Sequence, residues 1–147
     1  MIGAVRGFLE LLWGPPETSE ERLRLLATAL DRLAMAYHET SDGDLGDMPE
    51  LARDKRHARV ADAARRAFPD FGLYADVRPD QATSPEVLMG DALDDLTDIA
   101  QDMEDVLWRW ENNGTGDAAW HFRFGYRTHW GRHLHDLRRY VHARQFE

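Results

Sequence analysis

Gly90–Gly114 reads GDALDDLTDIAQDMEDVLWRWENNG, and this stretch decides the fold class. Its apolar residues recur three and four positions apart, which predicts a helix with one buried face. They are Leu93, Leu96, Ile99, Ala100, Met103, Val106, Leu107 and Trp110. A second stripe with the same spacing is acidic and comprises Asp91, Asp95, Asp98, Asp102 and Asp105. Like charges one turn apart repel each other, so this stripe needs cations, a metal or full hydration to balance it.

A second helix is expected directly after this one. Asn112–Gly116 is a turn signal, and Asp117 is expected to cap a helix over Trp120–Ala143. Because the connection is short, the two helices should form an antiparallel hairpin. Counting back from the turn brings Arg and His side chains toward the acidic stripe. The predicted binding or polar network comprises Asp91, Asp95, Asp98, Asp102, Asp105, Arg123, Arg127 and Trp130.

The rest of the chain predicts three more helices in a single domain over residues 1–147. Ile2–Trp13 has the pattern of a short amphipathic helix. Thr18 begins a capping box before a long helix that runs to about His38, and Pro49 suits the first turn of a third helix that ends near Ala67. The expected fold is all-α, a bundle of four long helices plus the short N-terminal one. Residues 68–84 are expected to form an ordered connection that packs on this bundle.

Composition excludes several classes of protein. The chain has 147 residues, 43% of them hydrophobic, which is enough for one domain with a packed core. Its net charge of −9 makes nucleic acid an unexpected partner. The absence of cysteine excludes disulfides and thiolate metal sites. No secretory signal or membrane-spanning run is recognisable, so a soluble, cytoplasmic protein without a membrane partner is expected.

Two histidines four residues apart suggest a metal site. His129 and His133 share one face of the predicted last helix, and this spacing lets both bind one ion. The facing helix would complete the ligand set, so the predicted metal ligands are Asp95, Asp98, Asp102, His129 and His133. The alternative interpretation is structural, with both histidines hydrogen-bonded to aspartates in a salt-bridge network. The sequence leaves both interpretations open.

The acidic helix and the segment after it resemble an uncharacterised bacterial family, DUF5063. Asp95–Asp105 reads DLTDIAQDMED, which is similar to an acidic D-L-x-D-I-x-Q-D-x-x-D pattern of that family. Trp130-Gly131, followed by a basic, leucine-containing helix, resembles a second element of the family. The resemblance implies an all-α fold. It implies no activity, cofactor or catalytic residue.

Three functions fit the sequence. The first is a binding or regulatory module that acts on a protein or small-molecule partner, since no catalytic set is complete, and for it no cofactor is expected. The second is a metal-dependent hydrolase of a phosphorylated small molecule at the Asp and His residues, with a divalent metal as its cofactor. The third is an immunity-type protein whose acidic surface masks a basic toxin. Whether the protein is an enzyme is left open by the sequence.

Overall fold

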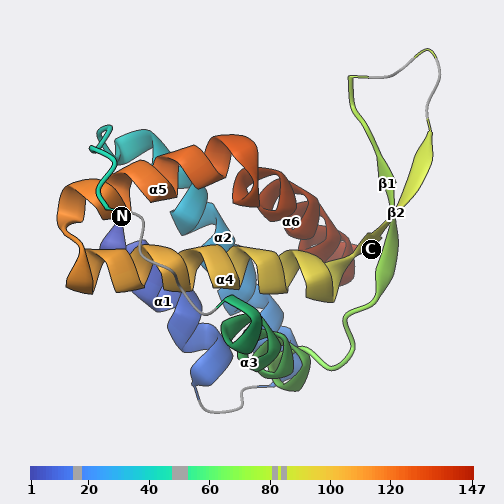
Figure 1. Ribbon diagram of the computed structural model, residues 1–147. Coiled ribbons are helices and arrows are strands. Elements are labelled where there is room, and N and C mark those ends of the chain that lie inside the picture. The colour runs from blue at the N-terminus through green and yellow to red at the C-terminus, as the bar shows by residue number, and fades with distance from the viewer. Residues whose placement is uncertain (15–17, 48–52, 81–82, 84–85) are drawn as a thin grey trace.

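The computed structural model describes residues 1–14, 18–47, 53–80, 83 and 86–147, which are mostly helical (Figure 1). The helices are α1 (Ile2–Trp13), α2 (Ser19–Glu39), α3 (Arg53–Ala67), α4 (Ala92–Asn112), α5 (Thr115–Thr128) and α6 (Trp130–Phe146). The strands are β1 (Leu73–Val77) and β2 (Val87–Asp91). Thr18 caps α2 by accepting a hydrogen bond of 3.3 Å from the Glu21 amide, as the sequence predicts. The expected first-turn residue of the third helix, Pro49, lies outside the described residues.

α4 is the helix around which the others are arranged. It crosses the middle of the molecule in Figure 1 and packs against α1, α3, α5 and α6. The apolar stripe read from the sequence supplies most of its buried apolar side chains, namely Leu96, Ile99, Ala100, Met103 and Val106. Burying a large apolar side chain stabilises the fold by about 1.5–3 kcal/mol. No helix in the described part of the chain has the length and apolarity needed to cross a membrane.

The last predicted helix is in fact two helices, so the sequence prediction is wrong at this point. α5 ends at Thr128 and α6 starts at Trp130, because His129 adopts φ −147° and ψ −87°, outside the helical region. Gly131 permits this tight junction, since a Cβ at that position would lie 2.2 Å from the Tyr126 carbonyl oxygen. In Figure 1, α5 and α6 follow one another along α4 in the opposite direction, so the antiparallel arrangement holds for both.

The connection before α4 contains a β-hairpin that the sequence does not predict. β1 and β2 pair antiparallel, with Leu73 opposite Asp91 and Val77 opposite Val87. The hairpin extends away from the helices in Figure 1 and leads directly into α4. The expectation of a mainly helical fold is therefore correct, but the expected bundle of four long helices and a short one is not. The described residues form a predominantly α-helical fold of six helices with a small two-stranded sheet.

Candidate metal centre

Two histidines and three aspartates meet where α6 begins beside α4. Asp95, Asp98 and Asp102 occupy successive turns of α4, on one side of the helix. His129 lies in the break between α5 and α6, and His133 lies one turn into α6. The structure thus brings together all five residues that the sequence singles out as metal ligands.

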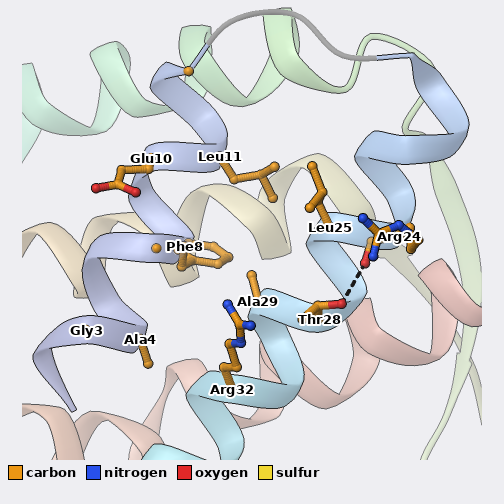
Figure 2. A pocket seen from close by; sticks show the side chains of 12 residues that line it. Gly3, Ala4, Phe8, Glu10, Leu11, Arg24, Leu25, Thr28, Ala29 and Arg32 are labelled. Atoms are coloured by element: carbon orange, nitrogen blue, oxygen red, sulfur yellow. Dashed lines mark hydrogen bonds between the residues drawn. The ribbon is translucent and has the colours of Figure 1, made fainter.

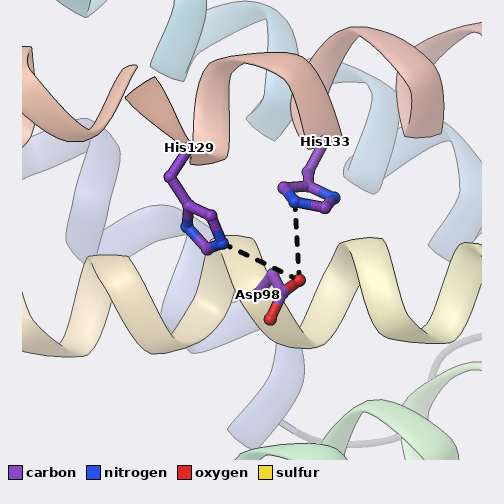
Figure 3. Close-up of side chains that lie close together, drawn as sticks. All are labelled: Asp98, His129 and His133. Carbon is purple, nitrogen blue, oxygen red and sulfur yellow. Dashed lines mark ion pairs between the residues drawn. The ribbon is translucent and has the colours of Figure 1, made fainter. Parts of the chain in front are cut away.

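Each histidine is held through its Nδ1 atom by a different aspartate. His133 Nδ1 lies 2.7 Å from Asp95 Oδ1, and His129 Nδ1 lies 2.7 Å from an Asp102 oxygen. An ionised carboxylate can only accept a hydrogen bond, so each Nδ1 carries a proton and donates it. The Nε2 atoms of His133 and His129 consequently face Asp98, at 3.5 Å and 4.0 Å from its Oδ2 atom (Figure 3).

The residues that can hold a metal are therefore a subset of those expected. One donor atom from each of Asp98, His129 and His133 lies within 4.8 Å of the other two. Two imidazole nitrogens and one carboxylate oxygen form a donor set that suits Zn²⁺ or Fe²⁺. Asp95 and Asp102, expected as ligands, instead orient the two imidazoles. Aspartates in this outer position fix the ring that binds the metal and increase its basicity.

Charges in this cluster shift the pKa values of its members. The hydrogen bond with Asp102 raises the pKa of His129, and the bond with Asp95 raises the pKa of His133, although burial opposes both effects. Burial raises the pKa of Asp98, and the two histidines partly offset this effect. Without a metal, the imidazoles thus hold a second proton more tightly than free histidine does. A metal ion would compete with that proton for Nε2.

Tyr74 of β1 extends the cluster into the hairpin, and the sequence analysis does not find it. Its hydroxyl donates a hydrogen bond to Asp95 Oδ2, the oxygen that does not contact His133. Burial and the adjacent Asp95 raise the pKa of Tyr74 well above its usual value, so the hydroxyl keeps its proton. Gly90 of β2 makes room for this ring, because a Cβ at Gly90 would lie 2.3 Å from Tyr74 Cζ. The strand pairing and a ring contact with Tyr140 hold Tyr74 beside α4.

A glycine and a tryptophan fix the position of His129. Trp130 is fully buried, and its indole nitrogen donates a hydrogen bond of 3.1 Å to the Phe122 carbonyl oxygen. Gly125 allows the ring to lie against α5, because a Cβ there would be 2.7 Å from Trp130 Cδ1. Trp130 was expected in the polar network, but this expectation needs correction. Trp130 is a core residue that anchors the start of α6.

A cleft of about 420 Å³ adjoins the metal cluster between α4 and α5. His129 and Asp102 belong to both the cluster and the wall of the cleft. Trp120 and Phe124 supply aromatic surface, and Asp105 adds a second carboxylate. Part of the aromatic set near the turn thus lines a cavity rather than the core.

Another groove, of about 450 Å³, lies between α1 and α2 and has a different character (Figure 2). Its wall is built largely from small and apolar residues such as Gly3, Gly7 and Leu25. Arg24 at its edge already forms an ion pair with Glu21. No group of three metal-ligating side chains lines this groove among the described residues, so the candidate site remains the cluster on α4.

The remaining residues of the predicted network have other partners. Asp91 caps α4 by accepting a hydrogen bond of 2.9 Å from the Leu93 amide. Arg123 does not meet the acidic stripe of α4: it binds Asp42 and donates to the carbonyl oxygens of Tyr37 and Thr40. The prediction for Arg127 is also wrong, because this exposed side chain donates to the Arg123 carbonyl oxygen. The register counted from the turn is correct for His133, which meets Asp95 and Asp98. It is wrong for the two arginines, which hydrogen-bond to residues outside α4.

Asp117 is a buried ion-pair partner rather than the expected helix cap. The N-cap of α5 is Gly114, at φ 105°, a left-handed conformation that favours glycine. Asp117 Oδ2 accepts hydrogen bonds of 2.8 Å from Arg109 Nη1 and from the Asn113 side chain. Its Oδ1 atom accepts one of 2.8 Å from the Gly46 amide. This ion pair joins α4, α5 and the loop after α2, and it lies away from the metal cluster.

Comparison with known proteins agrees with this architecture. The family model described as "Domain of unknown function (DUF5063)" matches residues 17–147. The chain belongs to the DUF5063 family. This confirms the resemblance carried by the Asp95–Asp105 pattern and by Trp130-Gly131. The family's description assigns no activity, so any function has to be argued from the site.

A solved structure has a similar fold. It is the crystal structure of protein BF1032 from Bacteroides fragilis, with a TM-score of 0.67 and 15% sequence identity. The match covers 99% of this chain and 93% of that chain. At this identity the likeness supports the fold alone. No curated protein matches the chain.

Proposed function

We propose that the protein binds a divalent transition metal through Asp98, His129 and His133, and that it acts as a metal-dependent binding module for a small molecule. The adjacent cleft would hold this partner, next to the coordination positions that the protein leaves open. The proposal joins the binding module and the metal site that the sequence suggested separately.

The arrangement of the two imidazoles carries the proposal. Asp95 and Asp102 each accept a hydrogen bond from one Nδ1 atom. Both Nε2 atoms therefore point to the same side, toward Asp98. A carboxylate that orients the far nitrogen of a metal-binding histidine is a common feature of protein metal sites. Finding this arrangement twice around one carboxylate supports a metal centre more strongly than the spacing of His129 and His133 alone.

Distances within the cluster favour a metal centre over a salt-bridge network. The contacts of 3.5 Å and 4.0 Å from Asp98 Oδ2 to the two Nε2 atoms are longer than the usual N–H···O hydrogen bond. Bonds of about 2.0–2.1 Å to Zn²⁺ would place tetrahedral ligand atoms about 3.3 Å apart. The two separations from Asp98 exceed this spacing by less than about 1 Å, so an inward movement, largest for His129, would bring these atoms to ion-binding distance.

Three protein ligands would leave the coordination shell open. The His129 side chain is 48% exposed, so the cluster can be reached from solvent. Structural zinc sites are usually closed by four protein ligands, whereas sites that bind or activate another molecule keep a free position. A free position beside a cleft fits a metal that binds a partner directly.

A second candidate, a metal-dependent hydrolase, is favoured by the same open position. A metal lowers the pKa of a bound water and makes it a nucleophile. The described side chains that line the cleft include neither Arg nor Lys, so a phosphorylated substrate would find its countercharge in the metal itself. Turnover of a chromogenic phosphate monoester by the metal-loaded protein, abolished in Asp98→Asn, would support this candidate over simple binding.

Metal analysis tests the proposal. Untagged protein purified without chelator is analysed by mass spectrometry for Zn, Fe, Mn and Ni, and metal-free protein is titrated calorimetrically with Zn²⁺. We expect one ion per chain and a loss of affinity of about 100-fold or more in His133→Gln, because losing a residue that merely orients a ligand already costs about 10–100-fold. His142→Gln is the matched control, since it removes an exposed histidine from the same helix. Substoichiometric metal, or equal affinity of all three proteins, would overturn the proposal.

A further inference from the structure

The cleft beside the metal cluster has an aromatic wall that remains open to solvent. Trp120 and Phe124 of α5 are stacked, with ring centroids 4.7 Å apart and an angle of 13° between their planes. Phe124 is 45% exposed although it is a large apolar residue. An exposed, ordered aromatic pair in a cleft favours binding of an apolar or flat molecule.

The opposite wall of the cleft is acidic. α4 contributes Asp102 and Asp105 to the lining. Neither Arg nor Lys lines the cleft among the described side chains, and the chain as a whole has a net charge of −9. The imidazoles of His121 and His129 also line the cleft, but its two carboxylates make the α4 wall attractive to cations.

We infer that the small molecule bound in this cleft is an organic cation, a protonated amine attached to an aromatic or apolar body. Its ammonium group would lie by Asp105 and Asp102, and its body would lie against Phe124 and Trp120. An ammonium group near the face of an aromatic ring gains cation–π attraction in addition to the ion pair. This inference rests on the proposed function, because it identifies the partner of the metal-dependent binding module.

The position of His129 explains how this ligand and the metal would share the site. The imidazole of His129 lines the cleft and also faces Asp98. A bound amine with a second, oxygen-containing group could therefore extend from Asp105 to the open coordination positions. The aromatic and acidic walls do not depend on the metal, so a simple amine should bind even to the metal-free protein.

Three probes of equal size separate charge from shape: benzylamine, benzyl alcohol and benzoate. Each is titrated into the metal-free and the Zn²⁺-loaded protein, and binding is followed by NMR shifts of the five tryptophan indole signals. The Trp120 signal is assigned by comparison with Trp120→Phe. In the metal-free protein we expect benzylamine to bind about fivefold or more tightly than benzyl alcohol, as cation–π attraction implies, and benzoate to bind least. The largest shift should be that of Trp120.

Two substitutions test the assignment of the walls. Asp105→Asn should abolish the preference for benzylamine over benzyl alcohol, and Phe124→Leu should weaken binding of both. Asp94→Asn is the matched control, because it removes one exposed charge from the same helix outside the cleft. Circular dichroism and melting curves confirm that each variant is folded. Asp102 is left unchanged because it also orients His129.

The outcomes separate this inference from the metal proposal. A preference for benzylamine that Asp105→Asn abolishes supports the inference, even if metal analysis finds no bound ion. Equal affinity for all three probes, a preference that survives in Asp105→Asn, or an unmoved Trp120 signal would overturn it. The last three results would leave a measured metal site intact.

Discussion

Tyr74 donates its hydroxyl hydrogen bond to Asp95, the carboxylate that also orients His133. The two residues come from different parts of the fold, since Tyr74 lies on the hairpin strand β1 and Asp95 lies in the first turn of α4. The hairpin thereby reaches the metal cluster through one hydroxyl group. It is more than a protruding connection, because it supplies the outermost partner of the His133 imidazole.

Replacing Tyr74 by Phe should weaken metal binding without unfolding the protein. The substitution removes the hydroxyl from Asp95 and leaves the ring in place, so His133 is held less firmly. We expect the affinity for Zn²⁺ to fall about tenfold, the lower end of the range for outer partners of metal ligands. Calorimetric titration measures the loss. Tyr126→Phe is the control, since its hydroxyl contacts His135 and not the cluster. Equal affinity in wild type and Tyr74→Phe would show that Asp95 needs no such support.

The Arg109–Asp117 ion pair should contribute much more to stability than an exposed pair. Both side chains are only 2% exposed, and Nη1 lies 2.8 Å from Oδ2. Removing one partner leaves a buried charge without compensation, so Asp117→Ala should cost about 3–5 kcal/mol of unfolding free energy. Glu111→Ala breaks the exposed pair with Arg6 and should cost about 1 kcal/mol or less. Urea denaturation compares them, and similar losses would contradict the buried assignment.

Acid should reduce the stability contributed by Asp117. Burial alone would raise the pKa of Asp117, but hydrogen bonds from Arg109, Asn113 and the Gly46 amide outweigh it, and the pKa lies below the usual value. A lowered pKa in the folded state stabilises the fold above the unfolded-state pKa, near 3.9, and this stability is lost as pH falls through the folded pKa. The difference in unfolding free energy between wild type and Asp117→Asn should therefore shrink below about pH 4. If the difference in unfolding free energy grew as the pH fell, the pKa of folded Asp117 would have to be raised and not lowered.

Two glycine substitutions should have opposite effects. Gly131→Ala places a Cβ 2.2 Å from the Tyr126 carbonyl oxygen, so the backbone between α5 and α6 must move. We expect a loss of about 1–3 kcal/mol, as for other overpacked positions, and weaker metal binding because His129 and His133 flank this glycine. Gly7→Ala meets nothing within 4 Å on α1 and should stabilise the helix by about 0.5–1 kcal/mol. Thermal melting distinguishes the two, and a neutral Gly131→Ala would mean that the junction can relax.

Much of the helical architecture is predictable because helix signals are local. The apolar stripe from Leu96 to Val106 repeats every three or four residues and is buried as expected. The Thr18 cap is likewise read from four consecutive residues. The hairpin is different, since Leu73–Val77 becomes a strand only by pairing with Val87–Asp91. That pairing depends on contacts between separate segments, so no local sequence pattern predicts it.

The sequence by itself determined that a row of aspartates shares one side of a helix. Helical periodicity is enough for that result, because residues three or four apart share a face whatever the rest of the chain does. The tertiary structure decided the role of each side chain: Asp98 faces both Nε2 atoms, Asp95 and Asp102 hold the Nδ1 atoms, and Arg127 takes no part. Hydrogen-bond partners depend on shifts of a few ångströms between packed helices. The helix break at His129 and the hairpin carrying Tyr74 set those shifts, and the hairpin forms only through contacts between separate segments of the chain.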